Sequence, residues 1–179
     1  MHLWQAARRF VGVINLLSIC SVAACTSSTD AAAAVPSFEA QLWVRGAMVA
    51  DFAKASSTTA FVFEDYIDIE SSQNGYQINL RGGLVGSGVS WDWLEICQGA
   101  SPMFLNYIGD SPSDGYSALA VGSLSKSTLS GSLTMSGTNP RRYSDKQVFP
   151  GKLEIRNGNF RLPTTKAQAR HYWCGSNSR

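Results

Sequence analysis

Apolar and polar residues alternate in short runs from Phe38 onward. In the first run, every second residue is apolar: Phe38, Ala40, Leu42 and Val44. Successive side chains of a β-strand point to opposite faces, so this period of two predicts strands with one buried face. The longer period of an amphipathic helix is nearly absent. We expect a short helix only at residues 164–172, where Thr164 or Thr165 could cap it.

Turn signals rich in Gly, Asn, Asp and Ser separate the runs. Beyond residues 38–44, strands are predicted at 60–70, 76–80, 89–97, 103–108, 117–124, 128–135, 152–156 and 159–162. Asn74-Gly75 and Asn157-Gly158 each predict a tight hairpin turn, because both residues of such a turn need positive φ. About eight or nine strands joined by short turns predict an all-β fold, an antiparallel barrel or sandwich that hides its sheet edges. The spacing leaves barrel and sandwich as equal alternatives.

The first residues of the chain follow a different pattern. Residues 1–9 contain two arginines and no acid, and residues 10–19 form an apolar run. This arrangement is typical of a signal peptide. A membrane-spanning helix needs roughly 20 apolar residues, and this run reaches a cluster of Ser and Thr too early for that.

The apolar run ends in Ser21-Val22-Ala23-Ala24-Cys25. This segment resembles the lipobox of bacterial lipoproteins, in which an aliphatic residue and two small residues precede a cysteine that receives lipid. The resemblance covers residues 1–25 and implies cleavage before Cys25 and anchoring of Cys25 in a membrane. In this family, Asp after the lipidated cysteine tends to retain the protein in the inner membrane. Thr26 occupies that position here, so the resemblance also implies the outer membrane, facing the periplasm. Ordinary signal cleavage within residues 31–34, which would discard Cys25, is the alternative.

Three segments follow from these patterns. Residues 1–24 are the predicted signal peptide, residues 25–36 a lipidated tether rich in Ser, Thr and Ala, and residues 37–179 a single β-rich domain. Two cysteines remain in the domain, Cys97 and Cys174, and we expect a disulfide between them in an exported protein. A zinc site is disfavoured, since His171 is the single histidine after Cys25 and no Cys-x-x-Cys spacing is present. We expect no metal and no cofactor.

Trp91 and Trp93 are the most conspicuous candidates for ligand binding. Strand alternation places both indoles on one face, together with Val89 and Cys97, where they could form a pocket for sugar rings or an apolar ligand. Packing in the core is the alternative. Asp65 interrupts the apolar face predicted for residues 60–70, so it is either a buried carboxylate with a raised pKa or a residue turned outward by a bulge.

Charge is divided unevenly along the chain. Acids outnumber bases up to Tyr116, and bases outnumber acids after it. Either the domain has a basic side that faces anionic lipid, wall polymer or an acidic partner, or the two halves pair their charges across the sheet. Nucleic acid is not an expected partner, because the bases form no recognisable binding motif and the protein is expected to be exported.

These patterns favour a non-enzymatic envelope lipoprotein whose β-domain binds a protein, a glycan or an apolar ligand. A glycan hydrolase would need a carboxylate pair, for which Asp65, Asp92 and Glu95 are the candidates. An inhibitor or immunity-type protein would present a loop, for which residues 109–115 and 138–146 are the candidates. His171 has no nucleophile motif around it, so a catalytic triad is unsupported.

Overall fold

The computed structural model describes residues 35–55, 57–143, 145–167 and 174. The predicted signal peptide, Cys25 and most of the predicted tether lie outside these residues. The described chain forms an 11-stranded sheet and no α-helix, which confirms the all-β prediction. Among the described residues, no helix is both long enough and apolar enough to cross a bilayer.

Seven strands close into a barrel. They are β3 (Ser57–Val62), β4 (Tyr66–Gln73), β5 (Tyr76–Val85), β6 (Gly88–Gln98), β9 (Tyr116–Ser125), β10 (Thr128–Thr138) and β11 (Lys152–Lys166). Neighbours along the ring are antiparallel except β3 and β11, whose parallel pairing runs from Ala60↔Thr164 to Val62↔Lys166. The barrel is therefore mixed, where the sequence predicted antiparallel pairing throughout. A closed ring of seven strands cannot alternate direction all the way round, so at least one neighbouring pair must be parallel.

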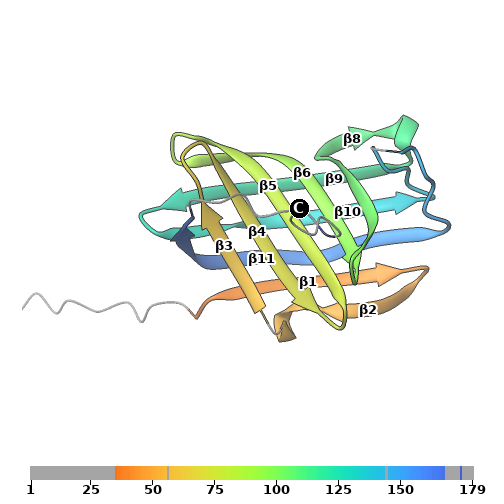
Figure 1. Cartoon of the computed structure of the whole chain (residues 1–179), viewed down its shortest axis with the longest axis horizontal. Helices are drawn as coiled ribbons and strands as arrows, with labels where there is room; N and C mark the ends of the chain where they lie inside the picture. The colour runs from red at the N-terminus through yellow and green to blue at the C-terminus, as the bar shows by residue number, and fades with distance from the viewer. Residues whose placement is uncertain (1–34, 56, 144, 168–173, 175–179) are drawn as a thin grey trace, which may run out of the picture. The chain divides into compact units, whose positions relative to one another are not determined.

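Four further strands extend the ring. They are β1 (Ser37–Val44), β2 (Ala47–Asp51), β7 (Ser101–Tyr107) and β8 (Gly109–Ser111). β1 pairs with β11 and β2 with β1, while β7 pairs with β6 and β8 with β9. Short 3-10 helices follow β2 (Phe52–Lys54) and β8 (Pro112–Asp114). Figure 1 shows β3 to β6 crossing the direction of β1, β10 and β11, so the barrel has two layers with the core between them.

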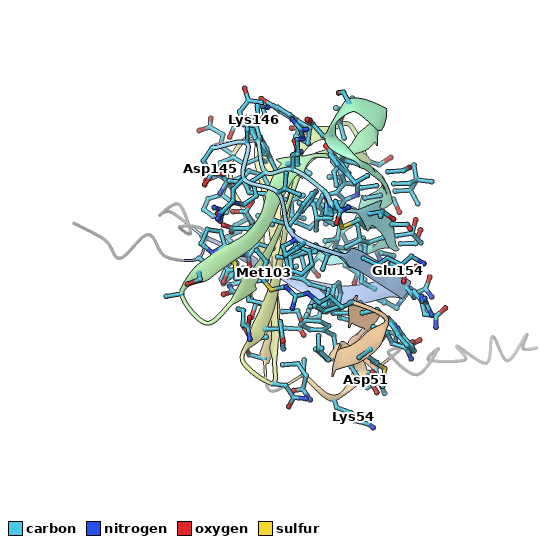
Figure 2. The ribbon with its side chains drawn as sticks, turned by 90° about the vertical axis from the view of Figure 1, so that its right-hand side faces the viewer. Asp51, Lys54, Met103, Asp145, Lys146 and Glu154 are labelled. Carbon is cyan, nitrogen blue, oxygen red and sulfur yellow. A yellow bond between two sulfur atoms is a disulfide. The ribbon has the colours of Figure 1, made fainter. Side chains whose placement is uncertain are left out.

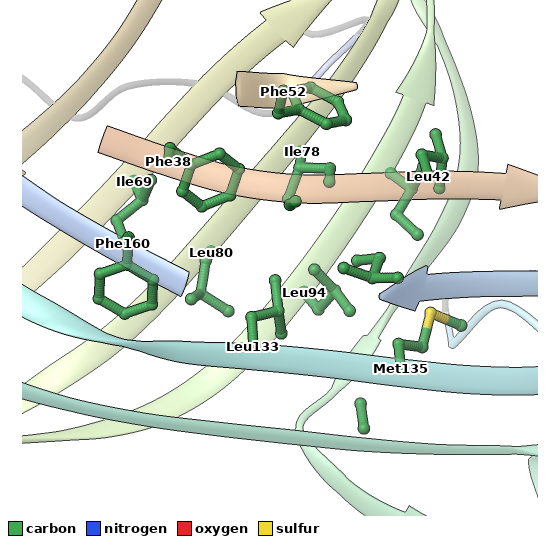
Figure 3. Close-up of a cluster of buried hydrophobic side chains, with 14 of the residues drawn as sticks. Phe38, Leu42, Phe52, Ile69, Ile78, Leu80, Leu94, Leu133, Met135 and Phe160 are labelled. Carbon is green, nitrogen blue, oxygen red and sulfur yellow. The ribbon is translucent and has the colours of Figure 1, made fainter. Parts of the chain in front are cut away.

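Apolar side chains from both layers meet in one cluster. Figure 3 shows Phe38 and Leu42 of β1 facing Ile78 and Leu80 of β5, with Phe160 of β11 beside them. Many of these side chains have no measurable exposure, and each fully buried Leu or Ile contributes about 1.5–3 kcal/mol. The period of two predicted this inward face correctly for β1, where Phe38, Ala40 and Leu42 are buried.

The predicted hairpin at Asn74-Gly75 is confirmed. Gln73 pairs with Tyr76 across the two-residue turn, and Asn74 and Gly75 have φ of 52° and 75°. The other Asn-Gly prediction was wrong, because β11 continues without a turn through Asn157 and Gly158. There the register against β1 slips by one residue, which is a β-bulge. A β-carbon at Gly158 would lie 2.1 Å from the Leu133 carbonyl oxygen, so glycine serves close strand approach here.

Two other expectations need correction. Residues 60–70 form two strands, because Glu64 and Asp65 make an exposed turn in which the Phe63 N–H donates to the Tyr66 carbonyl. The predicted helix at 164–172 begins instead as the end of β11, since residues 164–166 pair with β3. Residues 168–172 of that prediction lie outside the described residues.

Candidate functional site

A β-bulge in β6 separates the two tryptophans that sequence alternation placed together. Gly82 pairs with Trp91 while Arg81 pairs with Trp93, so Asp92 is an extra residue without a cross-strand partner in β5. The extra residue reverses the facing of the strand. Trp91 points into the core, and Trp93 lies on the outer face. The prediction that both share one face was therefore wrong.

Trp91 is a core residue, with only 7% of its surface exposed. Its indole packs edge-on against Phe160, with ring centroids 5.8 Å apart, and lies over Gly122 of β9. Its Nε1 is buried, with no hydrogen-bond partner in the described part of the chain. Trp91 thus fills the space between β6 and β9 and is not open to a ligand.

Trp93 belongs to a group of three rings, Trp93 of β6, Tyr107 of β7 and Tyr143, which we call the aromatic surface. Trp93 is partly buried in this group, and the two tyrosines are exposed. The ring centroid of Trp93 lies 3.9 Å from that of Tyr107 and 5.4 Å from that of Tyr143, and the two tyrosine rings are 5.0 Å apart. Both tyrosines are 45% exposed. Large aromatic side chains with this exposure are typical of recognition surfaces. Sequence reasoning found Trp93 but missed Tyr107 and Tyr143. The three residues are far apart in the sequence, and no local pattern indicates that they meet.

Hydrogen bonds hold the aromatic surface together. A side-chain hydrogen bond with Tyr143 is the largest cause that raises the pKa of Tyr107, and the nearby Asp92 charge acts in the same direction. Tyr107 is therefore a neutral phenol at neutral pH. The Tyr116 hydroxyl donates to the Tyr107 carbonyl at 2.9 Å, and Lys146 Nζ lies 5.0 Å from the centroid of the Tyr143 ring. These contacts fix the rings and add a positive charge at their edge.

Residues 139–151, here named the distal loop, carry Tyr143 and connect β10 to β11. The loop is joined to β7, because the Tyr143 N–H donates to the Leu105 carbonyl at 2.9 Å and Asn106 Nδ2 donates to the Arg141 carbonyl at 3.1 Å. A hollow of about 210 Å³ lies between the loop and β7 and is lined partly by Pro102 and Met103.

The aromatic surface lies at the end of the domain opposite to the entry of the chain. β1 begins at Ser37 beside Arg161 and ends at Val44 beside Leu153, next to the distal loop. Figure 1 shows β1 running from its entry at the left to the loop-bearing end at the right. Figure 2 looks onto that end, with Asp145 and Lys146 at its upper edge and Met103 below them.

Two of the three candidate carboxylates are exposed and the third is buried. Asp65 is exposed in the turn between β3 and β4, and Asp92 is exposed at the bulge in β6. Glu95 is only 1% exposed, on the outer face of β6. Of the two alternatives for Asp65, the structure supports the side chain that is turned outward, and the Asp65 carboxylate is not buried.

Glu95 lies beneath the disulfide. The disulfide joins Cys97 to Cys174 and confirms that prediction. Glu95 Oε2 accepts hydrogen bonds from Asn79 Nδ2 at 2.9 Å and from the Cys174 backbone N–H at 3.1 Å. Burial is the largest cause that raises the Glu95 pKa above its ordinary value, and the hydrogen bonds and the Arg81 charge oppose it only in part. Glu95 is buried, and both of these hydrogen bonds are to other residues of the protein, so its carboxyl group is not placed to reach a substrate.

Glu95 and the two sulfurs also lie within 4.8 Å of one another, a spacing seen among metal ligands. Metal ions bind cysteine as the thiolate, and here the sulfurs are bonded to each other. The residues present therefore do not make a metal site in the disulfide form.

The described ion pairs join residues from the same half of the chain. They are Lys54–Asp51, Arg81–Asp68, Arg142–Asp145, Lys152–Glu154 and Arg156–Glu154. None of these pairs crosses from the acidic to the basic half. The basic half supplies the distal loop and the start of β11. Its bases Arg141, Arg142, Lys146 and Lys152 lie there together with its two acids, Asp145 and Glu154.

No protein-family model matches the sequence, and neither a curated protein nor a solved structure matches it. The interpretation of the site therefore depends on its own geometry.

Proposed function

We propose that this protein is a lipid-anchored, non-enzymatic binding protein of the bacterial cell envelope, which holds a macromolecular partner at the aromatic surface. The lipobox resemblance at Cys25 supports the anchor. The grouping of Trp93, Tyr107 and Tyr143 from three separate segments carries the binding role, because a fixed aromatic cluster with two half-exposed rings is costly to leave in water.

The placement of the surface suits a partner held a short distance from a bilayer. A tether of residues 25–36 spans at most about 40 Å when fully extended. The eight residues of β1 extend by about 25 Å from the entry of the chain toward the aromatic surface. The lipid would thus hold one end of the domain while the rings at the other end contact a partner in the envelope space, with the outer membrane as the proposed site of attachment.

The burial of Glu95 supports a binding protein better than a glycan hydrolase that uses Glu95. A hydrolase needs an acid and a base or nucleophile that flank one bond of the substrate. Glu95 is buried with its Oε2 oxygen hydrogen-bonded, and it contacts the disulfide instead of an open cleft. A pair that includes Glu95 would therefore need the C-terminal Cys174 to move away.

The anchor and the surface are tested separately in the full-length chain made in a bacterium. We expect Cys25→Ala to move the protein from the membrane fraction to the soluble fraction, with its circular dichroism unchanged. A C25A protein that stays in the membrane fraction would contradict the lipid anchor.

The surface is tested by partner capture from detergent-solubilised envelope after chemical crosslinking. The double substitution Tyr107→Ala and Tyr143→Ala should lower the yield of crosslinked partner by about tenfold or more, since each lost hot-spot ring costs over 1 kcal/mol. Leu119→Ala is the control. Leu119 is a large apolar residue that is more exposed than either tyrosine, but it lies on β9, outside the aromatic surface. Equal capture by wild type and the double variant would refute the proposed surface.

A further inference from the structure

The described residues of the distal loop, 139–143 and 145–151, are joined to one another by hydrogen bonds. Arg141 and Val148 form a β-bridge, and the Arg142 N–H donates to the Gln147 carbonyl at 3.0 Å. At the base, the Asn139 N–H donates to the Gly151 carbonyl while Asn139 Oδ1 accepts from the Gly151 N–H. The loop is a short hairpin, so little conformational entropy is lost if it binds.

The partly buried Arg142 side chain joins residues of this hairpin to one another and to β7. Its guanidinium donates to the Asp145 carboxylate, to Gln147 Oε1 and to the Pro102 carbonyl of β7. Its side chain is only 14% exposed. The backbone N–H of Gln147 is the largest cause that lowers the Asp145 pKa, and Arg142 adds to it. Arg142 and Asp145 neutralise each other, so neither is the group that a partner would recognise.

Two exposed positive charges remain on the loop itself, while the exposed Asp92 lies near the Tyr107 ring. Arg141 and Lys146 are exposed on the loop. Arg45 donates to the Pro150 carbonyl at 3.0 Å and lies over the Phe149 ring, whereas Lys152, at the start of β11, pairs with Glu154. Cations with exposed heads beside exposed apolar groups complement an acidic surface.

The ring geometry favours a protein over a glycan. Sugar rings stack on open aromatic faces, but Trp93 and Tyr107 face each other with centroids 3.9 Å apart. Tyr143 stands edge-on to both, at interplanar angles of 81° and 84°. The cluster therefore offers ring edges and hydroxyls, and Val148, 43% exposed, adds an aliphatic group on the same loop. Edges, hydroxyls and apolar tips on a projecting hairpin fit a concave protein surface.

We infer that the partner of the aromatic surface is a folded protein with an acidic cleft, which receives the distal loop with Arg141 and Lys146 facing its carboxylates. This inference rests on the proposed function and names the kind of partner. Positive charge on the loop accelerates association, and the fixed hairpin lowers the cost of binding.

The test uses the lipidated protein, produced in a bacterium from the full-length sequence, with a photocrosslinking amino acid in place of Val148. The crosslinked molecule is identified by mass spectrometry, and the purified partner is then titrated with charge variants at low and physiological salt. The double reversal Arg141→Glu and Lys146→Glu should weaken binding by about tenfold or more, slow association and reduce the salt dependence. Arg161→Glu is the matched control, because Arg161 is exposed on β11 beside Ser37, at the other end of the domain. It should change binding by less than about twofold.

Three results would overturn the inference. One is a crosslink to polysaccharide, another is a partner whose contact residues are basic, and the third is unchanged binding by the double reversal. In each case, loss of binding by the Tyr107→Ala and Tyr143→Ala variant would leave the proposed function standing. If that aromatic variant also binds normally, both proposals fail.

Discussion

The indole of Trp91 lies directly against the backbone of Gly122. A β-carbon on Gly122 would stand 2.7 Å from the indole Nε1 and 2.9 Å from Cζ2, closer than packed atoms approach. In the described chain, β6 and β9 share the single register pair Gly88↔Ser123, so few backbone hydrogen bonds join these neighbours. The indole closes this part of the barrel wall by packing instead.

Gly122→Ala should therefore destabilise the domain by about 1–3 kcal/mol, the usual cost of overpacking a core. Gly83→Ala is the matched control in β5, where a β-carbon would meet nothing closer than 4.0 Å. Its effect should stay below about 1 kcal/mol. Urea unfolding followed by tryptophan fluorescence measures both variants. Equal stability of the two variants would show that Trp91 does not press on Gly122.

The disulfide between Cys97 and Cys174 should stabilise the domain by closing a long loop, since 77 positions separate the cysteines. Cys174→Ser should lower the free energy of unfolding by about 2–5 kcal/mol relative to the oxidised protein. Reduced wild type should match the variant in the same urea titration. A variant as stable as the oxidised protein would mean that the bond constrains nothing in the unfolded chain.

Glu95 should make stability depend on pH. Its folded pKa is raised above the ordinary value of 4.5, so between 4.5 and the folded pKa the folded state binds more protons than the unfolded state. The stabilising contribution is thus fully present below pH 4.5 and is lost as pH rises through the folded pKa. Glu95→Gln should flatten this part of the curve of unfolding free energy against pH. Glu154→Gln, which changes a carboxylate with a lowered pKa, is the control and should not flatten it.

Arg142→Ala should loosen the distal loop without unfolding the barrel. The substitution removes the guanidinium that joins Asp145, Gln147 and the Pro102 carbonyl. Amide hydrogen exchange in residues 139–151 should accelerate by about tenfold or more, while the free energy of unfolding changes by less than about 1 kcal/mol. Arg161→Ala, which removes an exposed cation from β11, should leave the loop protected. Unchanged exchange in the Arg142 variant would show that the backbone bridge alone holds the loop.

By itself, the sequence determined the all-β class, the inward face of β1, the hairpin at Asn74-Gly75 and the pairing of Cys97 with Cys174. These features follow from local alternation, from the φ that a turn needs and from the presence of two cysteines in an exported domain. Only the tertiary structure decided which side Trp93 faces, because one extra residue at Asp92 reverses the strand and nothing in the local pattern marks it. The parallel closure of β3 on β11 and the meeting of Trp93 with Tyr107 and Tyr143 were likewise decided in three dimensions. Contacts between distant segments depend on the whole path of the chain, and no local period encodes that path.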